Sequence, residues 1–251
     1  MKIKTYLINI KESTERKERV LRDISGYSLL DVEIVEAVNG KKLSEEKKDS
    51  LFDRKRFMWQ YAREPLDGEI GCTLSHRECY RRLLESDNEY ALILEDDVRF
   101  MYPDDVEFVL KKAVGMLLSC KNSIITLTHH HIYFSKRLWS MKNYSFYRIW
   151  TAYGTCAYLI NRSAAKKLLS IDKPFILADD FQYICLEGIY IQGIYPWLAL
   201  DASTMKSISS EIIDNRDNIA YIKIPFKYRL KKSILGKFRG LLFRMHILKW
   251  R

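Results

Sequence analysis

The sequence predicts an α/β protein whose sheet is buried on both faces and whose reactive groups gather at one edge. Residues 90–94 form a short, continuous apolar run without helical spacing, which is typical of a buried strand. Three carboxylates, Glu95, Asp96 and Asp97, follow directly. Because unpaired charge is costly to bury, the strand must end where these acids begin. Ligands bind at the carboxyl ends of strands in open α/β sheets, so the acids mark the expected site.

The three acids repel one another unless a positive group lies among them. A divalent cation would supply that charge, and hard oxygen ligands favour Mg²⁺ or Mn²⁺, which also bind substrate phosphates. Glu95 and Asp97 form an acid-x-acid pattern, and we expect these two to hold the metal and a diphosphate. The alternative is that the acids are solvated turn residues or the N-cap of a following helix. The buried strand directly before them favours the metal site.

The amino end of the chain indicates a strand, a turn and a helix. Residues 3–10 form an apolar strand, and a capped helix start with glutamate in its first turn follows Ser13. Such a unit suggests nucleotide binding, although no glycine-rich phosphate fingerprint is present. Residues 32–38 indicate a second strand, which ends at the turn signal Asn39-Gly40.

Apolar spacing predicts a helix over residues 69–85, directly before the central strand. Ser75 and His76 lie near its start. Because a helix N-terminus favours anions, a diphosphate is expected close by. The alternative for His76 is a structural role, which is the commoner one for a single histidine on a helix.

Two aromatic and charged stretches have no clear period. Residues 41–63 fit a surface helix or a mobile flap, and their aromatic side chains either pack on the core or stack against a base or sugar. Residues 133–150 fit a loop that covers a sugar acceptor, since aromatic faces suit sugar rings, or they represent ordinary packing.

Strands and helices alternate after the acids. We expect a helix from Asp104, a strand over residues 123–128, a strand over residues 151–160 and a capped helix from Asn161. In the second of these strands, Gly154-Thr155 allows close approach of the backbone to another group. Residues 195–208 are expected to close the site.

A second acid pair, Asp179-Asp180, stands at an expected helix start. Helix capping would explain one of the two aspartates but not both. A positioned carboxylate can remove a proton from a hydroxyl group, so Asp179 and Asp180 are both candidates for a catalytic base. The sequence does not separate them.

The C-terminal residues carry the excess positive charge. The net charge is +10, and residues 223–251 contain ten Lys or Arg and no acid. Their apolar residues are spaced along one helical face, so a basic amphipathic helix on a membrane surface is expected. Nucleic-acid binding is the competing interpretation, but no recognition motif accompanies the charge. A third interpretation is that this segment packs on a partner subunit. The sequence does not indicate the oligomeric state. We divide the chain into a catalytic domain, residues 1–222, and this tail.

The cysteine pattern and the amino terminus indicate the cellular compartment. Five cysteines are scattered without a Cys-x-x-Cys pair, which is neither a disulfide framework nor a zinc signature. We interpret them as small buried residues of a reducing compartment. The amino terminus has no signal-peptide profile, and no apolar run approaches the length of a bilayer span. We expect a cytoplasmic protein at the cytoplasmic face of the inner membrane.

Two long stretches resemble glycosyltransferase family 25. The first is Gly-Glu-Ile-Gly-Cys-Thr-Leu-Ser-His at residues 68–76, followed by Tyr-Ala-Leu-Ile-Leu-Glu-Asp-Asp-Val at residues 90–98. The second is Gly-Thr-Cys-Ala-Tyr-Leu-Ile-Asn-Arg-Ser-Ala-Ala-Lys-Lys-Leu at residues 154–168. The family includes bacterial lipopolysaccharide and lipooligosaccharide sugar transferases, with collagen galactosyltransferases as distant relatives. Asn39 departs from the aspartate of the family pattern, which puts a carboxylate role there in doubt.

The resemblance implies a nucleotide-sugar transferase of the GT-A type, a mixed sheet flanked by helices. It implies that the donor pocket includes Asn9 and Arg16, as well as Ser75, His76, Glu95, Asp96, Gly154 and Thr155. The residue-level alternative for Arg16 is an exposed helix residue paired with Glu12. The family also carries an Asp-Asp-aromatic element at the position of Asp179-Asp180.

The expected reaction is metal-dependent, inverting transfer of a hexose, galactose from UDP-galactose, to a hydroxyl group of a lipid-linked lipooligosaccharide or lipopolysaccharide core. The divalent cation would neutralise the departing diphosphate, and Asp179 or Asp180 would accept the proton. The alternative is a non-catalytic, membrane- or nucleic-acid-associated module that has kept the fold. A phosphoryl-transferring enzyme would need a glycine-rich phosphate loop, which the sequence lacks.

Overall fold

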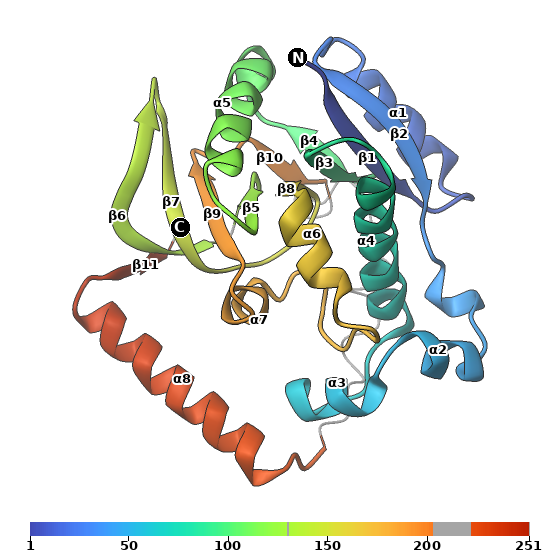
Figure 1. The fold of residues 1–251 in the computed structure, drawn as a ribbon, viewed down its shortest axis with the longest axis vertical. Coiled ribbons are helices and arrows are strands. Elements are labelled where there is room, and N and C mark those ends of the chain that lie inside the picture. Colours follow the sequence, from blue (N-terminus) through green and yellow to red (C-terminus); the bar gives the residue numbers. More distant parts are fainter. Residues whose placement is uncertain (130, 203–221, 251) are drawn as a thin grey trace.

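A computed structural model gives the structure of the protein and describes residues 1–129, 131–202 and 222–250. Within these residues, nine strands form one sheet in the order β11-β6-β7-β9-β5-β8-β3-β1-β2 (Figure 1). They are β1 (Ile3–Asn9), β2 (Leu30–Glu36), β3 (Tyr90–Glu95), β5 (Ser123–Thr126), β6 (His131–Met141), β7 (Tyr144–Ala152), β8 (Ala157–Asn161), β9 (Tyr190–Tyr195) and β11 (Leu248–Trp250). Strands β4 (Val98–Phe100) and β10 (Ala199–Asp201) form a separate antiparallel pair.

The sheet is mixed. Strand β1 is parallel to β2 and β3, and β5 is parallel to β9. Strand β8 lies between β3 and β5 and is antiparallel to both. The α/β class and the mixed sheet flanked by helices, which the sequence and its resemblance predicted, are confirmed.

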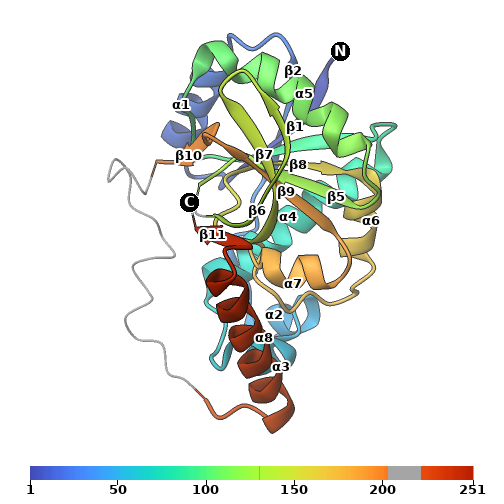
Figure 2. The same ribbon diagram turned by 90° about the vertical axis from the view of Figure 1, so that its left-hand side faces the viewer.

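Helices cover both faces of the sheet (Figures 1 and 2). Helices α1 and α5 contribute to the core on one face, and α4, α6 and α7 contribute to the core on the other. The helices are α1 (Thr14–Ile24), α2 (Glu45–Leu51), α3 (Arg54–Tyr61), α4 (Asp67–Glu85), α5 (Val106–Leu118), α6 (Arg162–Leu169), α7 (Phe181–Leu186) and α8 (Phe226–Arg244), with short 3₁₀ turns η1 (Gly40–Lys42) and η2 (Pro103–Asp105).

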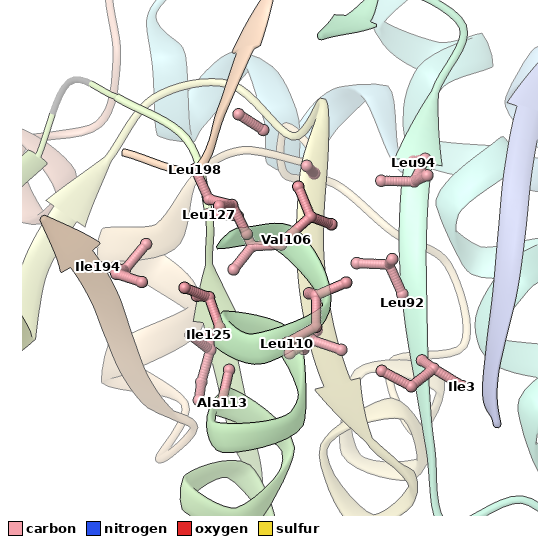
Figure 3. Packing of buried hydrophobic residues seen from close by; sticks show 14 of the residues in the cluster. Ile3, Leu92, Leu94, Val106, Leu110, Ala113, Ile125, Leu127, Ile194 and Leu198 are labelled. Atoms are coloured by element: carbon pink, nitrogen blue, oxygen red, sulfur yellow. The ribbon is translucent and has the colours of Figure 1, made fainter. Parts of the chain in front are cut away.

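Strand β3 is the centre of both cores. Side chains alternate between the two faces of a strand, so Leu92 and Leu94 enter the core beneath α5, whereas Ala91 and Ile93 enter the core beneath α4 and α6. Figure 3 shows Leu92 and Leu94 pointing toward Val106 and Leu110 of α5. With apolar residues on both faces, the strand has no room for charge until it reaches its carboxyl end.

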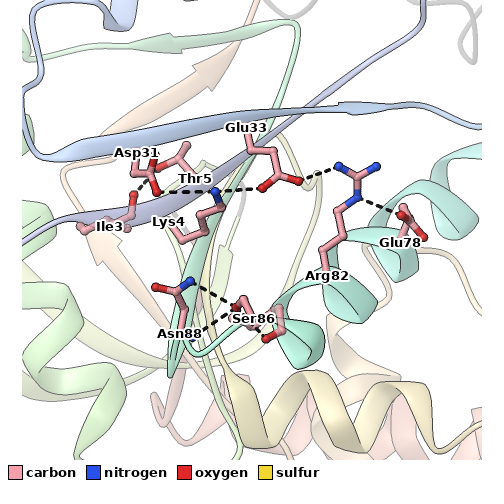
Figure 4. A network of polar contacts seen from close by, with 10 residues as sticks. Ile3, Lys4, Thr5, Asp31, Glu33, Glu78, Arg82, Ser86 and Asn88 are labelled. Carbon is pink, nitrogen blue, oxygen red and sulfur yellow. Dashed lines mark hydrogen bonds and ion pairs between the residues drawn. The ribbon is translucent and has the colours of Figure 1, made fainter.

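A polar network on the β2 edge holds α4 against the sheet. Lys4 Nζ of β1 lies 2.9 Å from Glu33 Oε2 of β2, and Arg82 Nη1 of α4 donates a 2.6 Å hydrogen bond to Glu33 Oε1 (Figure 4). Arg82 Nε also donates to Glu78 of its own helix at 2.9 Å. The alternating charges place α4, and therefore its first turns, at a fixed position relative to β1.

The first turns of α4 pack directly on η1. A Cβ atom added to Gly71 would lie 2.3 Å from the carbonyl oxygen of Val38, and one added to Gly40 would lie 1.8 Å from the carbonyl oxygen of Asp67. Two glycines from distant parts of the sequence therefore allow two backbones to touch. Asn39 caps η1 by accepting the backbone N–H of Lys41 at 3.1 Å, which an aspartate could also do.

Of the two interpretations of residues 133–150, the loop over a sugar acceptor is wrong, because this stretch forms the hairpin of β6 and β7. Their pairing has register shifts near Tyr133, Arg137 and Trp139, and these irregularities break the alternation of side chains that would reveal a strand. The single strand expected over residues 151–160 is also interrupted. Strand β7 ends at Ala152, and β8 begins at Ala157, after Gly154 with a φ of 83°.

The C-terminal residues join the rest of the fold. The predicted helix is confirmed as α8, and the following strand β11 pairs with β6 at the edge of the main sheet. The division at residue 222 stays a prediction. Residues 195–208 were expected to close the site, and those after Ala202 lie outside the described part of the chain. No helix among the described residues has the length and apolar character to cross a membrane.

Candidate functional site

Glu95 ends β3 and is held ionised by two neighbours. Its Oε1 accepts a 2.5 Å hydrogen bond from Thr155 Oγ1 and lies 3.2 Å from His76 Nε2. Burial opposes ionisation of Glu95, but the contacts with His76 and Thr155 outweigh it and lower the pKa of the carboxyl. Three residues that the sequence predicted for one pocket are therefore brought together from α4, β3 and the turn before β8.

Asp96 turns the other way and binds the amino end of the chain. Asn9 Nδ2 donates a 2.7 Å hydrogen bond to Asp96 Oδ2, and Arg16 Nη2 lies 2.5 Å from Asp96 Oδ1. Arg19 Nη2 donates to the carbonyl oxygen of Asp96 at 2.8 Å. The alternative pairing of Arg16 with Glu12 is wrong, because Glu12 pairs with Lys42. Asn9, Arg16 and Asp96 thus form one polar cluster.

Asp97 is the least compensated of the three acids. Its Oδ2 lies 3.8 Å from Arg16 Nη2, while its Oδ1 is buried and has no hydrogen-bond partner among the described residues. Burial and the charge of Glu95 raise the pKa of Asp97 to about 8, although Arg16 opposes the shift. A buried carboxylate oxygen without a partner, beside an ionised glutamate, fits a position that a cation would complete.

Asp201 is a fourth acid at this place, and the sequence interpretation missed it. Residue 201 pairs with Val98 in the β4–β10 ladder, and the backbone N–H of Ala202 donates to the carbonyl oxygen of Asp97 at 2.8 Å. The charge of Asp201 also raises the pKa of Asp97. Like Glu95, Asp201 directly follows a run of apolar residues, and that pattern could have revealed it.

Asp179 and Asp180 have different surroundings. Asp180 caps α7 by accepting the backbone N–H of Tyr183 at 2.9 Å, and it accepts a 2.5 Å hydrogen bond from the hydroxyl of Tyr61. Asp179 Oδ2 accepts the backbone N–H of Gly154 at 3.1 Å. Burial raises the pKa of Asp179, with a smaller contribution from the charge of Asp180. Capping therefore accounts for Asp180, and the assignment of the catalytic base to either aspartate stays a prediction.

One cavity of about 730 Å³ joins the two acid groups, a size typical of a small-molecule site. Of the predicted site residues, it is lined by Glu95, Asp97, Gly154, Thr155, Asp179 and Asp180. Asp201 lines the same cavity. Carboxylates from the end of β3, from β10 and from the turn before α7 thus face a common space.

Five of the predicted site residues do not line this cavity. The turn that carries Asp97 is held by contacts among Asn9, Arg16 and Asp96. Ser75 is buried; its hydroxyl donates to the carbonyl oxygen of Gly71 at 2.7 Å and accepts the backbone N–H of Val38 at 2.8 Å. His76 reaches the site through Glu95. Their assignment to donor binding stays a prediction.

A second set of possible metal ligands shares Glu95 with the first. Ligand atoms of Cys72, His76 and Glu95 lie within 4.8 Å of one another, and a Cys-His-carboxylate set is typical of zinc. However, His76 Nδ1 is 2.8 Å from the Tyr158 hydroxyl and its Nε2 faces Glu95, so both ring nitrogens already have partners. Burial also raises the pKa of the Cys72 thiol and disfavours the thiolate that a metal needs. The set is better described as a hydrogen-bonded support for Glu95.

Comparison with known proteins gives consistent matches. Residues 2–183 match the family described as "Glycosyltransferase family 25 (LPS biosynthesis protein)". The chain is 32% identical over 176 residues to a "Glycosyltransferase 25 family member" of Anopheles gambiae, covering 65% of this chain and 28% of that protein. It is 38% identical over 98 residues to "Procollagen galactosyltransferase 2" of Homo sapiens, covering 38% of this chain and 16% of that protein.

Among solved structures, the chain is similar to a CMP:2-keto-3-deoxy-manno-octonic acid synthetase complexed with CTP. The identity is 11% and the TM-score is 0.41, with 77% of this chain and 89% of that chain covered. The matched part of this chain corresponds to less than a third of the length of the curated relatives described above.

Proposed function

Because this chain belongs to glycosyltransferase family 25, we propose that it is a hexosyltransferase. It transfers galactose from UDP-galactose to a hydroxyl group of a lipooligosaccharide or lipopolysaccharide core. The family description names lipopolysaccharide biosynthesis, which supports the acceptor. The printed names of the procollagen galactosyltransferases support galactose as the sugar, although those relatives are named for a collagen acceptor.

The observation that carries the proposal is the shared cavity of Glu95, Asp97 and Asp179. Transfer of a sugar needs one group that neutralises the departing diphosphate and another that accepts the proton of the acceptor. Carboxylates that hold a cation can support the first task, and a separate carboxylate can perform the second. This chain has both kinds of group in one space large enough for a nucleotide sugar.

We assign Glu95 and Asp97 to a divalent cation, Mn²⁺ or Mg²⁺. When bound, such a cation acts as a Lewis acid that neutralises charge on the diphosphate. Asp97 Oδ1 has no hydrogen-bond partner among the described residues, so a cation bound to this oxygen would break no hydrogen bond to those residues. Glu95 is oriented by Thr155 and His76, and Asp96 anchors the turn through Arg16.

We assign Asp179 as the base. The acceptor hydroxyl oxygen attacks the anomeric carbon, the bond from that carbon to the UDP oxygen breaks, and the hydroxyl proton moves to Asp179. Attack on the face opposite the leaving group inverts the anomeric configuration. Because burial raises the pKa of Asp179, this carboxylate is a stronger base than an exposed aspartate.

The lipid-linked acceptor is also consistent with the outer surface of α8. Phe226, Leu230, Ile234 and Leu241 are exposed on this helix, and residues 223–251 carry no acid. Apolar side chains among cations favour an anionic lipid surface. We propose that the protein associates through α8 with the cytoplasmic face of the inner membrane.

The test is release of UDP from a panel of UDP-sugars, first without an acceptor and then with a lipooligosaccharide core or a collagen peptide. We expect UDP-galactose to be cleaved slowly alone and rapidly with the core, with loss of activity in chelator and recovery with Mn²⁺ or Mg²⁺. Full activity in chelator would contradict the metal, and preference for the peptide would contradict the acceptor. Failure to cleave any UDP-sugar would instead favour the non-catalytic binding module.

A further inference from the structure

Helix α8 is held along the cavity by contacts near both of its ends. Near its start, Tyr228 contacts Trp59 of α3 with ring centroids 5.6 Å apart. Toward its end, Phe238 contacts Trp150 of β7 at 6.0 Å, and Leu242 is buried in a cluster with Ile132 of β6. Figures 1 and 2 show α8 as a long helix that runs from the region of α3 to the β6 edge of the sheet. The helix is therefore part of the site and not only a surface tail.

One face of α8 lines the cavity, and it is a cationic face. The lining residues of this helix are Tyr228, Lys231, Lys232, Leu235, Gly236 and Arg239. Residues three or four positions apart lie on the same face of a helix, and these six residues follow that spacing. Leu230, Ile234 and Leu241 lie between and beyond them in the sequence and are exposed. The geometry of the helix thus directs three cations to the cavity, together with Tyr228 and Leu235, and leaves the apolar side chains of Leu230, Ile234 and Leu241 exposed.

The three cations have few neutralising contacts in the part of the chain that the structure describes. Within the described residues, no ion pair joins Lys231, Lys232 or Arg239 to a carboxylate, whereas Arg63 in the same cavity forms paired hydrogen bonds of 2.8 Å and 2.6 Å with Glu69. Lys231 Nζ lies over the ring of Tyr183 at 5.7 Å. Partial desolvation by the surrounding walls lowers the pKa of Lys232, and the charge of Asp180 opposes that shift. The cavity thus offers positive charge that an anionic ligand could use.

We propose that Lys231, Lys232 and Arg239 form a phosphate-binding subsite on the α8 wall of the cavity. Arg matches the geometry of phosphate oxygens and Lys supplies mobile point charge, so the set suits a phosphate or diphosphate group. The inference rests on the proposed function, in which two substrates can carry such a group. One is the diphosphate of the UDP-sugar, and the other is a phosphate on the acceptor core.

The test compares two triple variants of the full chain that remove the same charge from the same helix. The first is K231Q/K232Q/R239Q in the cavity, and the control is R229Q/K237Q/R244Q, whose positions do not line it. The probes are inorganic pyrophosphate and UDP, measured by calorimetry, and a lipooligosaccharide core before and after phosphatase treatment, measured by its KM. Circular dichroism and thermal unfolding check that both variants fold.

If the donor diphosphate occupies the subsite, the cavity variant binds UDP and pyrophosphate at least about tenfold more weakly, since charge-assisted hydrogen bonds are lost. If an acceptor phosphate occupies it, the cavity variant raises the KM of the untreated core and not that of the phosphatase-treated core. The control variant changes the binding of UDP and pyrophosphate by less than about twofold, as expected for exposed charges that do not line the cavity.

Equal effects of the two variants, or no effect of the cavity variant on any of these quantities, would overturn the subsite. If the cavity triple does not fold, the single variant Lys231→Gln, at an exposed side chain, is measured in the same way. Pyrophosphate binding does not depend on sugar transfer. A wild-type protein that binds pyrophosphate through α8 but cleaves no UDP-sugar would contradict the proposed function and leave the anion subsite standing.

Discussion

The hydroxyl of Tyr61 donates a 2.5 Å hydrogen bond to Asp180 Oδ2, so α3 reaches the N-cap of α7. The same hydroxyl accepts the backbone N–H of Leu177 at 3.1 Å. Asp180 therefore belongs to a junction between two helices and the loop before α7. Asp179, its neighbour, lines the cavity with a raised pKa and accepts the backbone N–H of Gly154. Two adjacent aspartates of the same chemistry thus have different surroundings, and we expect them to have separate tasks.

The first prediction separates these tasks. We expect Asp179→Asn to lower kcat by about 100-fold or more with little change in thermal stability, because it removes the base but keeps the shape of the side chain. We expect Asp180→Asn to weaken the cap and the Tyr61 contact and to reduce the free energy of unfolding by about 1–2 kcal/mol, while keeping measurable turnover.

Steady-state kinetics and urea denaturation of both variants check this prediction. Tyr61→Phe is the matched control, since it removes one partner of Asp180 and leaves Asp179 unchanged. Normal turnover in Asp179→Asn, combined with lost turnover and unchanged stability in Asp180→Asn, would reverse the assignment.

The second prediction concerns pH in the metal-free protein. The folded-state pKa of Asp97, about 8, lies above the ordinary aspartate value of 3.8, so the native state binds the proton more tightly than the unfolded state. The contribution of this group to stability is therefore highest at acidic pH and decreases as the pH rises from about 4 to about 8. Asp97→Asn should remove this decrease and stabilise the chelated protein at pH 8 relative to wild type.

Differential scanning calorimetry in chelator, repeated with Mn²⁺ or Mg²⁺, measures this effect. The metal should raise the Tm of the wild type at pH 8, because it stabilises the ionised carboxylate, and should have less effect on Asp97→Asn. The two proteins would show parallel pH profiles and equal metal responses if Asp97 were an ordinary surface acid.

The third prediction tests the contact between α4 and η1. Gly71→Ala places a Cβ 2.3 Å from the carbonyl oxygen of Val38, a backbone atom that cannot rotate away. We expect a loss of about 1–3 kcal/mol in the free energy of unfolding, as for other overpacked sites. The control is Gly115→Ala in α5, where an added Cβ meets no atom within 4 Å.

Gly115→Ala should leave stability unchanged or raise it by about 0.5–1 kcal/mol, because alanine is the better helix former. Chemical denaturation measures both variants. Equal stability of Gly71→Ala and Gly115→Ala would show that the two backbones are not in close contact.

The fourth prediction concerns the support behind the acids. Arg16→Gln removes the cation beside the buried carboxylate of Asp96 and leaves that charge without its strongest partner. Breaking a buried pair on one side costs about 3–5 kcal/mol, whereas replacing both partners costs less. We therefore expect the double variant R16Q/D96N to be more stable than Arg16→Gln alone.

A double-mutant cycle in urea, with Arg16→Gln, Asp96→Asn and the pair, gives the coupling energy directly. We expect UDP-sugar hydrolysis to fall in Arg16→Gln, because the turn that carries Asp97 loses its anchor. Additive effects of the two single substitutions would contradict a direct pair between these residues.

Several features could be predicted from the chain alone. The apolar run before Glu95 predicted β3 and its acid-bearing end, because a strand buried on both faces excludes charge along its whole length. Asn161 as the N-cap of α6 and the basic helix α8 were also predictable, since capping and helical spacing are local properties. Membership of the family followed from the motifs around these same elements.

Other features depended on contacts between distant residues. The hairpin of β6 and β7 was missed because register shifts disturb the alternation of its side chains. Asp179 and Asp180 could not be separated by sequence, since Tyr61, 119 residues away from Asp180, makes the difference between them. The amphipathic pattern of α8 indicated two faces but could not say which one meets the cavity.

The sequence by itself determined the elements whose causes are local: apolar runs, helix caps and helical spacing. Only the tertiary structure decided that Asp201 stands beside Asp97, that Asp180 is a structural cap and that Lys231, Lys232 and Arg239 face the cavity. The physical reason is that burial, electrostatic coupling and hydrogen-bond partners are set by neighbours in space, and the order of residues along the chain does not record those neighbours.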